Sequence, residues 1–127
     1  MSTQGPVVAV VDDDPRLLES LGELLESDGH VVRGFSSAEA LLAEGLSDLN
    51  VLITDIGMPG LSGLELRDLV ERVRPDLPVI LITGRHEIAD RLRAGGLARL
   101  FCKPFDGPAL LEAVGDAISD REKGEPQ

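Results

Sequence analysis

Five short aliphatic runs, each followed by an amphipathic stretch, constrain the fold of this chain more than any other feature of its sequence. The runs lie at residues 7–11, 31–32, 51–54, 78–82 and 100–102. The first run is apolar at every position, as expected of a strand that is buried on both faces. Between the runs, leucine and valine residues recur at the spacing typical of helices that bury one side. The chain therefore alternates between predicted strands and predicted helices.

This alternation predicts an α/β fold: a doubly wound, five-stranded parallel sheet with helices on both faces. Helix boundaries are also readable in the sequence. Asp14 is predicted to cap the first helix, Pro15 suits its first position, and Gly29 is predicted to end it. We expect one domain over residues 1–127, with a core over residues 6–119 and a polar tail over residues 120–127.

Composition excludes several classes of protein. With 12 Lys and Arg residues against 23 Asp and Glu residues, the formal net charge is −11, which argues against direct nucleic-acid binding. The single cysteine, Cys102, allows no internal disulfide framework and no Cys-rich metal site. No apolar run approaches the roughly 20 residues that span a bilayer. We therefore expect a cytoplasmic protein that does not contact membranes.

Polar side chains follow four of the five predicted strands. Asp12 and Asp13 follow the first, Asp55 the third, Thr83 the fourth and Lys103 the fifth. The carboxyl ends of parallel strands meet at one edge of a sheet, where open α/β sheets bind their ligands. We therefore expect these five residues to lie close together at that edge.

The chemistry of this group indicates a phosphoryl-transfer site. Several carboxylates at one edge repel each other unless a cation or raised pKa values relieve the repulsion. Mg²⁺ takes oxygen ligands and commonly bridges carboxylates to a phosphate. Lys103 adds a compact positive charge with three donors. These residues predict a transferable phosphoryl group, with Asp55 as the nucleophile and Mg²⁺ as the cofactor.

Four segments make the chain resemble the receiver domains of two-component response regulators, over about residues 6–119. They are VVDDD at 10–14, TDIGMPGLSG at 54–63, ITG at 82–84 and KPF at 103–105. Each segment alone is a weak signal, but the four in this order and spacing are specific. The sequence is most similar to the FixJ-like group, whose receivers often precede a helix-turn-helix DNA-binding domain. The resemblance implies the flavodoxin-like strand order 2-1-3-4-5.

The resemblance also implies a metal site. Asp12 and Asp13 match the acidic pair that holds Mg²⁺, with Asp13 as the more direct ligand. Asp55 matches the phosphoacceptor and is expected to be a further metal ligand. The backbone carbonyl of Gly57 is expected to complete the ligands from the protein.

Three further positions match the receiver pattern. Thr83 matches the hydroxyl that turns inward to a phosphoryl oxygen, and Lys103 matches the lysine that pairs with the phosphate. The peptide bond between Lys103 and Pro104 is expected to be cis, a geometry that only X-Pro bonds tolerate cheaply. Gly84 is expected to keep access to the acceptor open.

The chain departs from the receiver pattern at two places. Leu100 occupies the position of the usual aromatic residue, three positions before the lysine, and Phe101 follows one residue late. The interval from Thr83 to Lys103 is shorter than the common pattern. We therefore expect a trimmed helix at about residues 87–94, or a trimmed loop before it. Both departures affect the region that usually reads out phosphorylation.

The resemblance implies a histidine kinase or a phosphotransfer protein as the partner that supplies the phosphoryl group. It also implies a partner face made of the helix at about 87–94, the strand at 100–102 and the last helix, through which a homodimer could form. Several arginines make this region the most basic part of an acidic chain: Arg85, Arg91, Arg93 and Arg99. The expected output is dimerisation, control of an effector domain, partner binding or onward transfer.

Two alternatives to this phosphorylation-dependent switch stay open at this point. The first is a degenerate receiver that acts as a constitutive binding module. The second is a Mg²⁺-dependent phosphatase with Asp55 as its nucleophile. A phosphatase of the haloacid dehalogenase type would need a second Asp two residues after Asp55, where Gly57 stands. Beyond its own phosphotransfer and dephosphorylation, we expect no enzymatic activity.

Overall fold

The centre of the molecule is a parallel sheet of five strands, in a computed structural model that describes residues 5–97 and 99–123. The strands are β1 (Val7–Val11), β2 (Val31–Phe35), β3 (Val51–Asp55), β4 (Val79–Thr83) and β5 (Leu100–Cys102). Their order is β2-β1-β3-β4-β5, and each neighbouring pair is parallel. The predicted fold class and strand order are confirmed.

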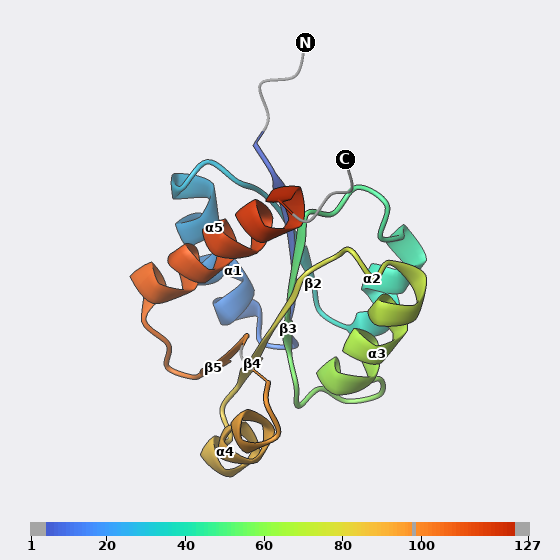
Figure 1. Ribbon diagram of the computed structural model, residues 1–127, viewed down its shortest axis with the longest axis vertical. Coiled ribbons are helices and arrows are strands. Elements are labelled where there is room, and N and C mark those ends of the chain that lie inside the picture. The colour runs from blue at the N-terminus through green and yellow to red at the C-terminus, as the bar shows by residue number, and fades with distance from the viewer. Residues whose placement is uncertain (1–4, 98, 124–127) are drawn as a thin grey trace.

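Helices cover both faces of this sheet. They are α1 (Pro15–Ser27), α2 (Ala38–Glu44), α3 (Gly63–Val73), α4 (His86–Ala94) and α5 (Gly107–Lys123). In Figure 1, α1 and α5 lie on one side of the sheet, and α2 and α3 lie on the other. The helix α4 lies at the bottom of the view, next to β4 and β5. Within the described residues, no helix is both long and apolar enough to span a membrane.

The strand β1 is apolar throughout because successive side chains point to opposite faces and both faces are buried. Val8 and Val10 pack with α1 and α5, in a cluster that includes Leu21 and Leu110. The residues that alternate with them in sequence, Ala9 and Val11, pack with α2 and α3 on the other face. Leu81 and Leu100 form a third, smaller cluster with Ala89 of α4. Two aliphatic layers therefore hold the sheet rigid, so its polar edge has a fixed geometry.

Short polar side chains begin three of the helices. The Asp14 carboxylate accepts the Arg16 N–H at 3.0 Å, as predicted for the cap of α1. The Ser37 hydroxyl accepts the Ala40 N–H of α2 at 3.1 Å. Ser62 and Glu65 form a capping box at the start of α3, with each side chain accepting the other residue's N–H. These caps fix where each loop ends and each helix begins.

The last helix, α5, continues to Lys123, so residues 120–123 of the expected polar tail are helical. This part of the helix makes a contact with another part of the fold. The Asp120 carboxylate lies 3.3 Å from the guanidinium of Arg99, which precedes β5. This ion pair ties the last part of the helix to the sheet. Residues 124–127 lie outside the described residues.

The start of α3 lies very close to the end of β3. The Gly63 N–H donates to the Ile56 carbonyl at 3.0 Å. A Cβ atom on Gly63 would lie only 2.1 Å from the backbone oxygen of Asp55. Because no side chain fits between these two segments, the close approach of α3 to β3 depends on a glycine at this position.

We predict that Gly63→Ala lowers the free energy of unfolding by about 1–3 kcal/mol, because the new methyl group forces β3 and α3 apart. The matched control is Gly115→Ala in α5, where a Cβ atom would meet nothing within 4 Å. That change should raise the free energy of unfolding by up to about 1 kcal/mol through helix propensity. Urea denaturation of both variants measures the difference. Equal stability of the two variants would contradict the close approach described above.

Candidate functional site

The polar residues predicted at the strand ends do meet at one edge of the sheet. Asp12 directly follows β1, Asp55 ends β3, Thr83 ends β4 and Lys103 directly follows β5. The registers of the strands align these ends, with Asp55 opposite Ile82 and Thr83 opposite Cys102. The sheet order also places β3 between β1 and β4, so Asp55 lies in the middle of the group.

Three carboxylates form a compact acidic cluster. Asp12, Asp13 and Asp55 each offer an oxygen atom, and these atoms all lie within 4.8 Å of one another. Asp12 and Asp55 are buried, whereas Asp13 is exposed. Clustered carboxylate oxygens are the donors that Mg²⁺ prefers, and an exposed position leaves room for the waters that this ion keeps. The donor set therefore fits a hard divalent cation.

Lys103 bridges the two buried carboxylates. Its Nζ donates to Asp12 Oδ2 at 2.8 Å and lies 3.4 Å from Asp55 Oδ1. The other Asp12 oxygen accepts the Asp14 N–H at 2.9 Å, so both oxygens of this fully buried carboxylate are engaged. The Lys103-Pro104 peptide bond is cis, as predicted. Of the two buried carboxylates, Asp55 has the weaker contact with Lys103.

The charges of the cluster act on each other. Burial, followed by the negative charge of Asp12, raises the pKa of Asp55, while Lys103 lowers it only in part. Burial alone would lower the pKa of Lys103, but its hydrogen bond with Asp12 and the charges of Asp12 and Asp55 raise that pKa overall. The ammonium group therefore stays charged, and the site retains an excess of negative charge that a cation would relieve.

Thr83 connects this edge to α4. Its side chain is buried, and its hydroxyl oxygen accepts the Arg85 N–H at 3.1 Å. Arg85 is the N-cap residue of α4, and its own side chain makes no cap hydrogen bond. Gly84 lies between them, and a Cβ atom there would meet nothing within 4 Å. The first turn of α4 therefore depends on a hydroxyl at the polar edge.

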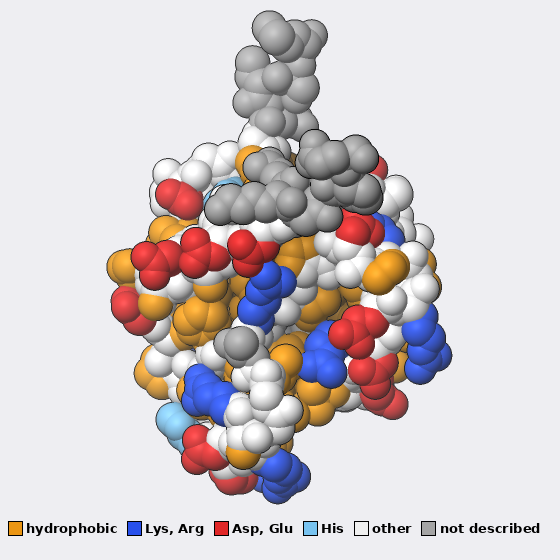
Figure 2. Space-filling model, viewed as in Figure 1, with side chains coloured by type: hydrophobic (Ala, Val, Ile, Leu, Met, Phe, Trp, Pro, Cys, Tyr) orange, Lys and Arg blue, Asp and Glu red, His pale blue; other side chains and the backbone are white. Residues whose placement is uncertain are grey.

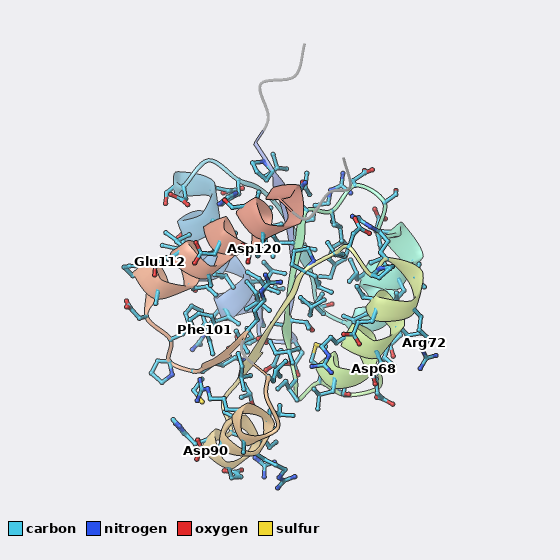
Figure 3. The ribbon with its side chains drawn as sticks, in the orientation of Figure 1. Asp68, Arg72, Asp90, Phe101, Glu112 and Asp120 are labelled. Carbon is cyan, nitrogen blue, oxygen red and sulfur yellow. The ribbon has the colours of Figure 1, made fainter. Side chains whose placement is uncertain are left out.

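The two neighbours on β5 lie on opposite faces of the sheet. Leu100 is buried against Leu81 and Ala89, on the face that α4 covers. Phe101 packs with the cluster of α1 and α5, and Figure 3 labels it at that position. The aromatic ring is thus separated from α4 by the sheet. A guanidinium N–H of Arg93 in α4 donates to the Leu100 carbonyl at 3.1 Å.

Sequence reasoning missed two contacts near this edge. One is the Arg93 contact with the Leu100 carbonyl. The other is a hydrogen bond from the Leu61 N–H to the Glu39 carboxylate, at 3.0 Å. Each joins residues of different elements, and each uses a backbone group of one partner, so neither leaves a signal in residue spacing. Gly57, whose carbonyl is a predicted metal ligand, is exposed, and a Cβ atom there would meet nothing within 4 Å.

Comparison with known proteins agrees with this fold. The family model for the response regulator receiver domain matches residues 8–115. The transcriptional regulatory protein FixJ of Azorhizobium caulinodans is 40% identical over 110 residues, which cover 84% of this chain and 52% of that protein. Nodulation protein W of Bradyrhizobium diazoefficiens is 38% identical over 125 residues, which cover 95% of this chain and 55% of that protein.

Solved structures give the same result. A response regulator receiver domain protein from Clostridium thermocellum superposes with a TM-score of 0.83 at 28% identity, covering 94% of this chain and 98% of that one. The beryllofluoride-activated NtrC4 receiver domain dimer gives a TM-score of 0.77 at 26% identity, covering 91% of this chain and 98% of that one. This chain belongs to the receiver domains of two-component response regulators. It spans about half the length of the two relatives named above.

The raised pKa of Asp55 predicts how stability depends on pH. The folded state holds the Asp55 proton more tightly than the unfolded chain does, because of burial and the charge of Asp12. The stability that this group contributes is therefore present at low pH. It is lost as pH rises from the ordinary Asp pKa of 3.8 through the raised pKa of the folded state.

We predict that metal-free Asp55→Asn is more stable than the wild type at pH 7, by on the order of 1 kcal/mol. Lys103 keeps its partner Asp12 in this variant. The difference should vanish below the ordinary Asp pKa of 3.8, where both proteins are uncharged at this position. Urea denaturation across this pH range in a chelator measures the effect, with the exposed Asp116→Asn as the control. If the difference in the free energy of unfolding between Asp55→Asn and the wild type grew toward acidic pH, the predicted direction of the Asp55 pKa shift would be wrong.

Proposed function

We propose that this receiver domain is a phosphorylation-dependent switch that accepts a phosphoryl group on Asp55 in a Mg²⁺-dependent reaction. One observation carries the proposal: the Asp55 carboxylate lies in a cluster of three carboxylates within 4.8 Å and 3.4 Å from the Lys103 ammonium. Such an arrangement provides a nucleophile, a cation site and a fixed positive charge at one point.

The metal site would be made by the Asp12, Asp13 and Asp55 carboxylates, with the backbone carbonyl of Gly57. When bound, Mg²⁺ supplies positive charge that offsets the charge on the oxygen atoms of the phosphoryl group. Asp13 suits the most direct role because it is the exposed member of the cluster. Asp12 is already held by Lys103 and the Asp14 N–H.

The transfer itself follows from the remaining residues. An oxygen of Asp55 attacks the phosphorus of a phosphohistidine on a histidine kinase or a phosphotransfer protein. The new O–P bond forms as the N–P bond breaks, and the histidine leaves with the electron pair of that bond. Lys103 pairs with the phosphoryl oxygens, and the Thr83 hydroxyl donates to one of them. Attack of water on the acyl phosphate then restores the Asp55 carboxylate and releases inorganic phosphate.

The output is expected at the face formed by α4, β5 and α5. In Figure 2, basic and acidic side chains both lie over α4, and acidic side chains form a row over α5, so this face is charged and mixed in sign. The NtrC4 receiver, a structural neighbour, is described as a dimer in its activated form. We infer that phosphorylation acts through dimerisation, control of an effector domain or partner binding at this face.

The name of one relative supports an inference about where this chain is located. FixJ is named as a transcriptional regulatory protein. Transcriptional regulators act on DNA, so we infer a cytoplasmic location for this chain. The net charge of −11 argues that DNA contact, where it occurs, is made by a different domain and not by this one.

The test is to incubate the protein with acetyl phosphate and Mg²⁺ and to resolve phosphorylated from free protein. We predict an adduct that is stable to acid and labile to alkali, as an acyl phosphate is. Asp55→Asn should abolish it, and an excess of chelator should strongly reduce it, because the cation that offsets the charge of the phosphoryl oxygens is then absent.

The other outcomes identify the alternatives. Absence of an adduct in the wild type, with the fold intact, would favour a degenerate receiver that binds its partner constitutively. Steady turnover of a phosphomonoester such as p-nitrophenyl phosphate would favour a phosphatase. An adduct that persists in Asp55→Asn would place the acceptor elsewhere and overturn the assignment of Asp55.

A further inference from the structure

Glu39 contacts the loop beside the acidic cluster although it belongs to a different part of the fold. It lies in the first turn of α2, two residues after the Ser37 cap. Its Oε2 accepts the N–H of Leu61, in the loop that connects β3 to α3, at 3.0 Å. Figure 1 shows α2 next to α3 on one side of the sheet. The contact therefore joins α2 to the loop that leaves Asp55.

The loop is shaped to receive this carboxylate. Gly60 has a φ of +75°, a conformation that favours glycine. A Cβ atom on Gly60 would lie 2.8 Å from Oε2 of Glu39. The close fit exists because the residue before Leu61 has no side chain. The Glu39 carboxylate therefore lies against both Gly60, which has a left-handed conformation, and the Leu61 N–H.

The other hydrogen bonds of the loop are local. The Met58 and Gly63 N–H groups both donate to the Ile56 carbonyl, at 3.2 and 3.0 Å. Ser62 is held by the capping box of α3. These bonds fix the two ends of the loop, and the Glu39 bond fixes its outer part from a third element. Gly57 lies within this loop and has no side chain to orient it.

Electrostatics supports the same contact. The hydrogen bond from Leu61 lowers the pKa of Glu39, so its carboxylate is ionised at neutral pH. A backbone N–H that donates to an ionised carboxylate forms a stronger bond than one between neutral groups. The acidic side chain in the first turn of α2 also interacts favourably with the helix dipole.

We propose that Glu39 is a positioning residue for the cation site: it fixes the loop between β3 and α3, and through it the direction of the Gly57 carbonyl. This inference rests on the proposed function, because it requires a cation at Asp12, Asp13 and Asp55 that also takes the Gly57 carbonyl. Outer contacts of this kind orient ligands and thereby set the affinity of a metal site. Loss of the Glu39 contact should therefore weaken cation binding without removing a ligand.

The experiment compares Glu39→Ala with Glu39→Gln in the whole chain. Titration calorimetry with MgCl₂ measures the dissociation constant, which should rise about ten-fold in Glu39→Ala. Glu39→Gln keeps an oxygen acceptor for the Leu61 N–H and should stay close to the wild type. Glu44→Ala, exposed in the last turn of the same helix, removes the same charge and should bind Mg²⁺ as the wild type does.

Two further readouts test positioning rather than charge. Hydrogen exchange measured by NMR should show a faster-exchanging Leu61 amide in metal-free Glu39→Ala, but not in Glu39→Gln. Labelling by acetyl phosphate should need about ten-fold more Mg²⁺ in Glu39→Ala, yet reach the wild-type level at saturation. Gly60→Ala, which displaces Glu39 from the other side, should weaken Mg²⁺ binding in the same way.

The outcomes separate this inference from the proposed function. Wild-type Mg²⁺ affinity in Glu39→Ala, with an intact Asp55-dependent adduct, would overturn the positioning role and leave the switch standing. Equal weakening in Glu39→Gln and Glu39→Ala would assign the effect to charge and would also overturn it. A wild-type protein that neither binds Mg²⁺ nor forms the adduct would overturn the proposed function, and this inference with it.

Discussion

The ion pair between Lys103 and Asp12 is the interaction on which the polar edge depends. Asp12 is fully buried, and a buried carboxylate without a partner is costly. Its bond to Lys103 at 2.8 Å joins the residue after β1 to the residue after β5, across the ends of β3 and β4. One contact thus holds the two flanks of the edge together and places Asp55 between them. Removing Lys103 would leave the buried charge of Asp12 without its ion pair.

This arrangement leaves the negative charge at Asp55 incompletely neutralised. Three carboxylates against one ammonium leave two negative charges in the cluster. Because Lys103 donates its shorter bond to Asp12, the Asp55 carboxylate interacts with it over 3.4 Å. Burial and the remaining charge raise the pKa of Asp55. A divalent cation would balance the charge of the cluster. The excess negative charge that it would balance comes from the side chains of the protein alone.

Sequence patterns predicted the elements and the strand-end residues because both depend on local rules. Apolar runs bury strands, and the carboxyl ends of parallel strands meet at one edge, so Asp12, Asp55 and Lys103 could be grouped without a structure. Contacts between elements follow no such rule. The Glu39 bond to the Leu61 N–H depends on how α2 packs beside α3, and any residue type at position 61 except proline offers that N–H. The ion pair between Arg99 and Asp120 likewise joins residues that are distant in the sequence.

The hydrogen bonds that α4 makes with the strands beside it involve backbone groups. Phe101 lies on the face of α1 and α5, and Leu100 is buried on the face of α4. Two contacts remain: the Thr83 hydroxyl accepts the N–H of Arg85 at the start of α4, and Arg93 donates to the Leu100 carbonyl. A hydroxyl donates and accepts at once. The Thr83 hydroxyl oxygen can therefore accept the Arg85 N–H at the start of α4 while the hydroxyl proton is donated to an acceptor at the polar edge. A single hydroxyl group then links the polar edge to α4.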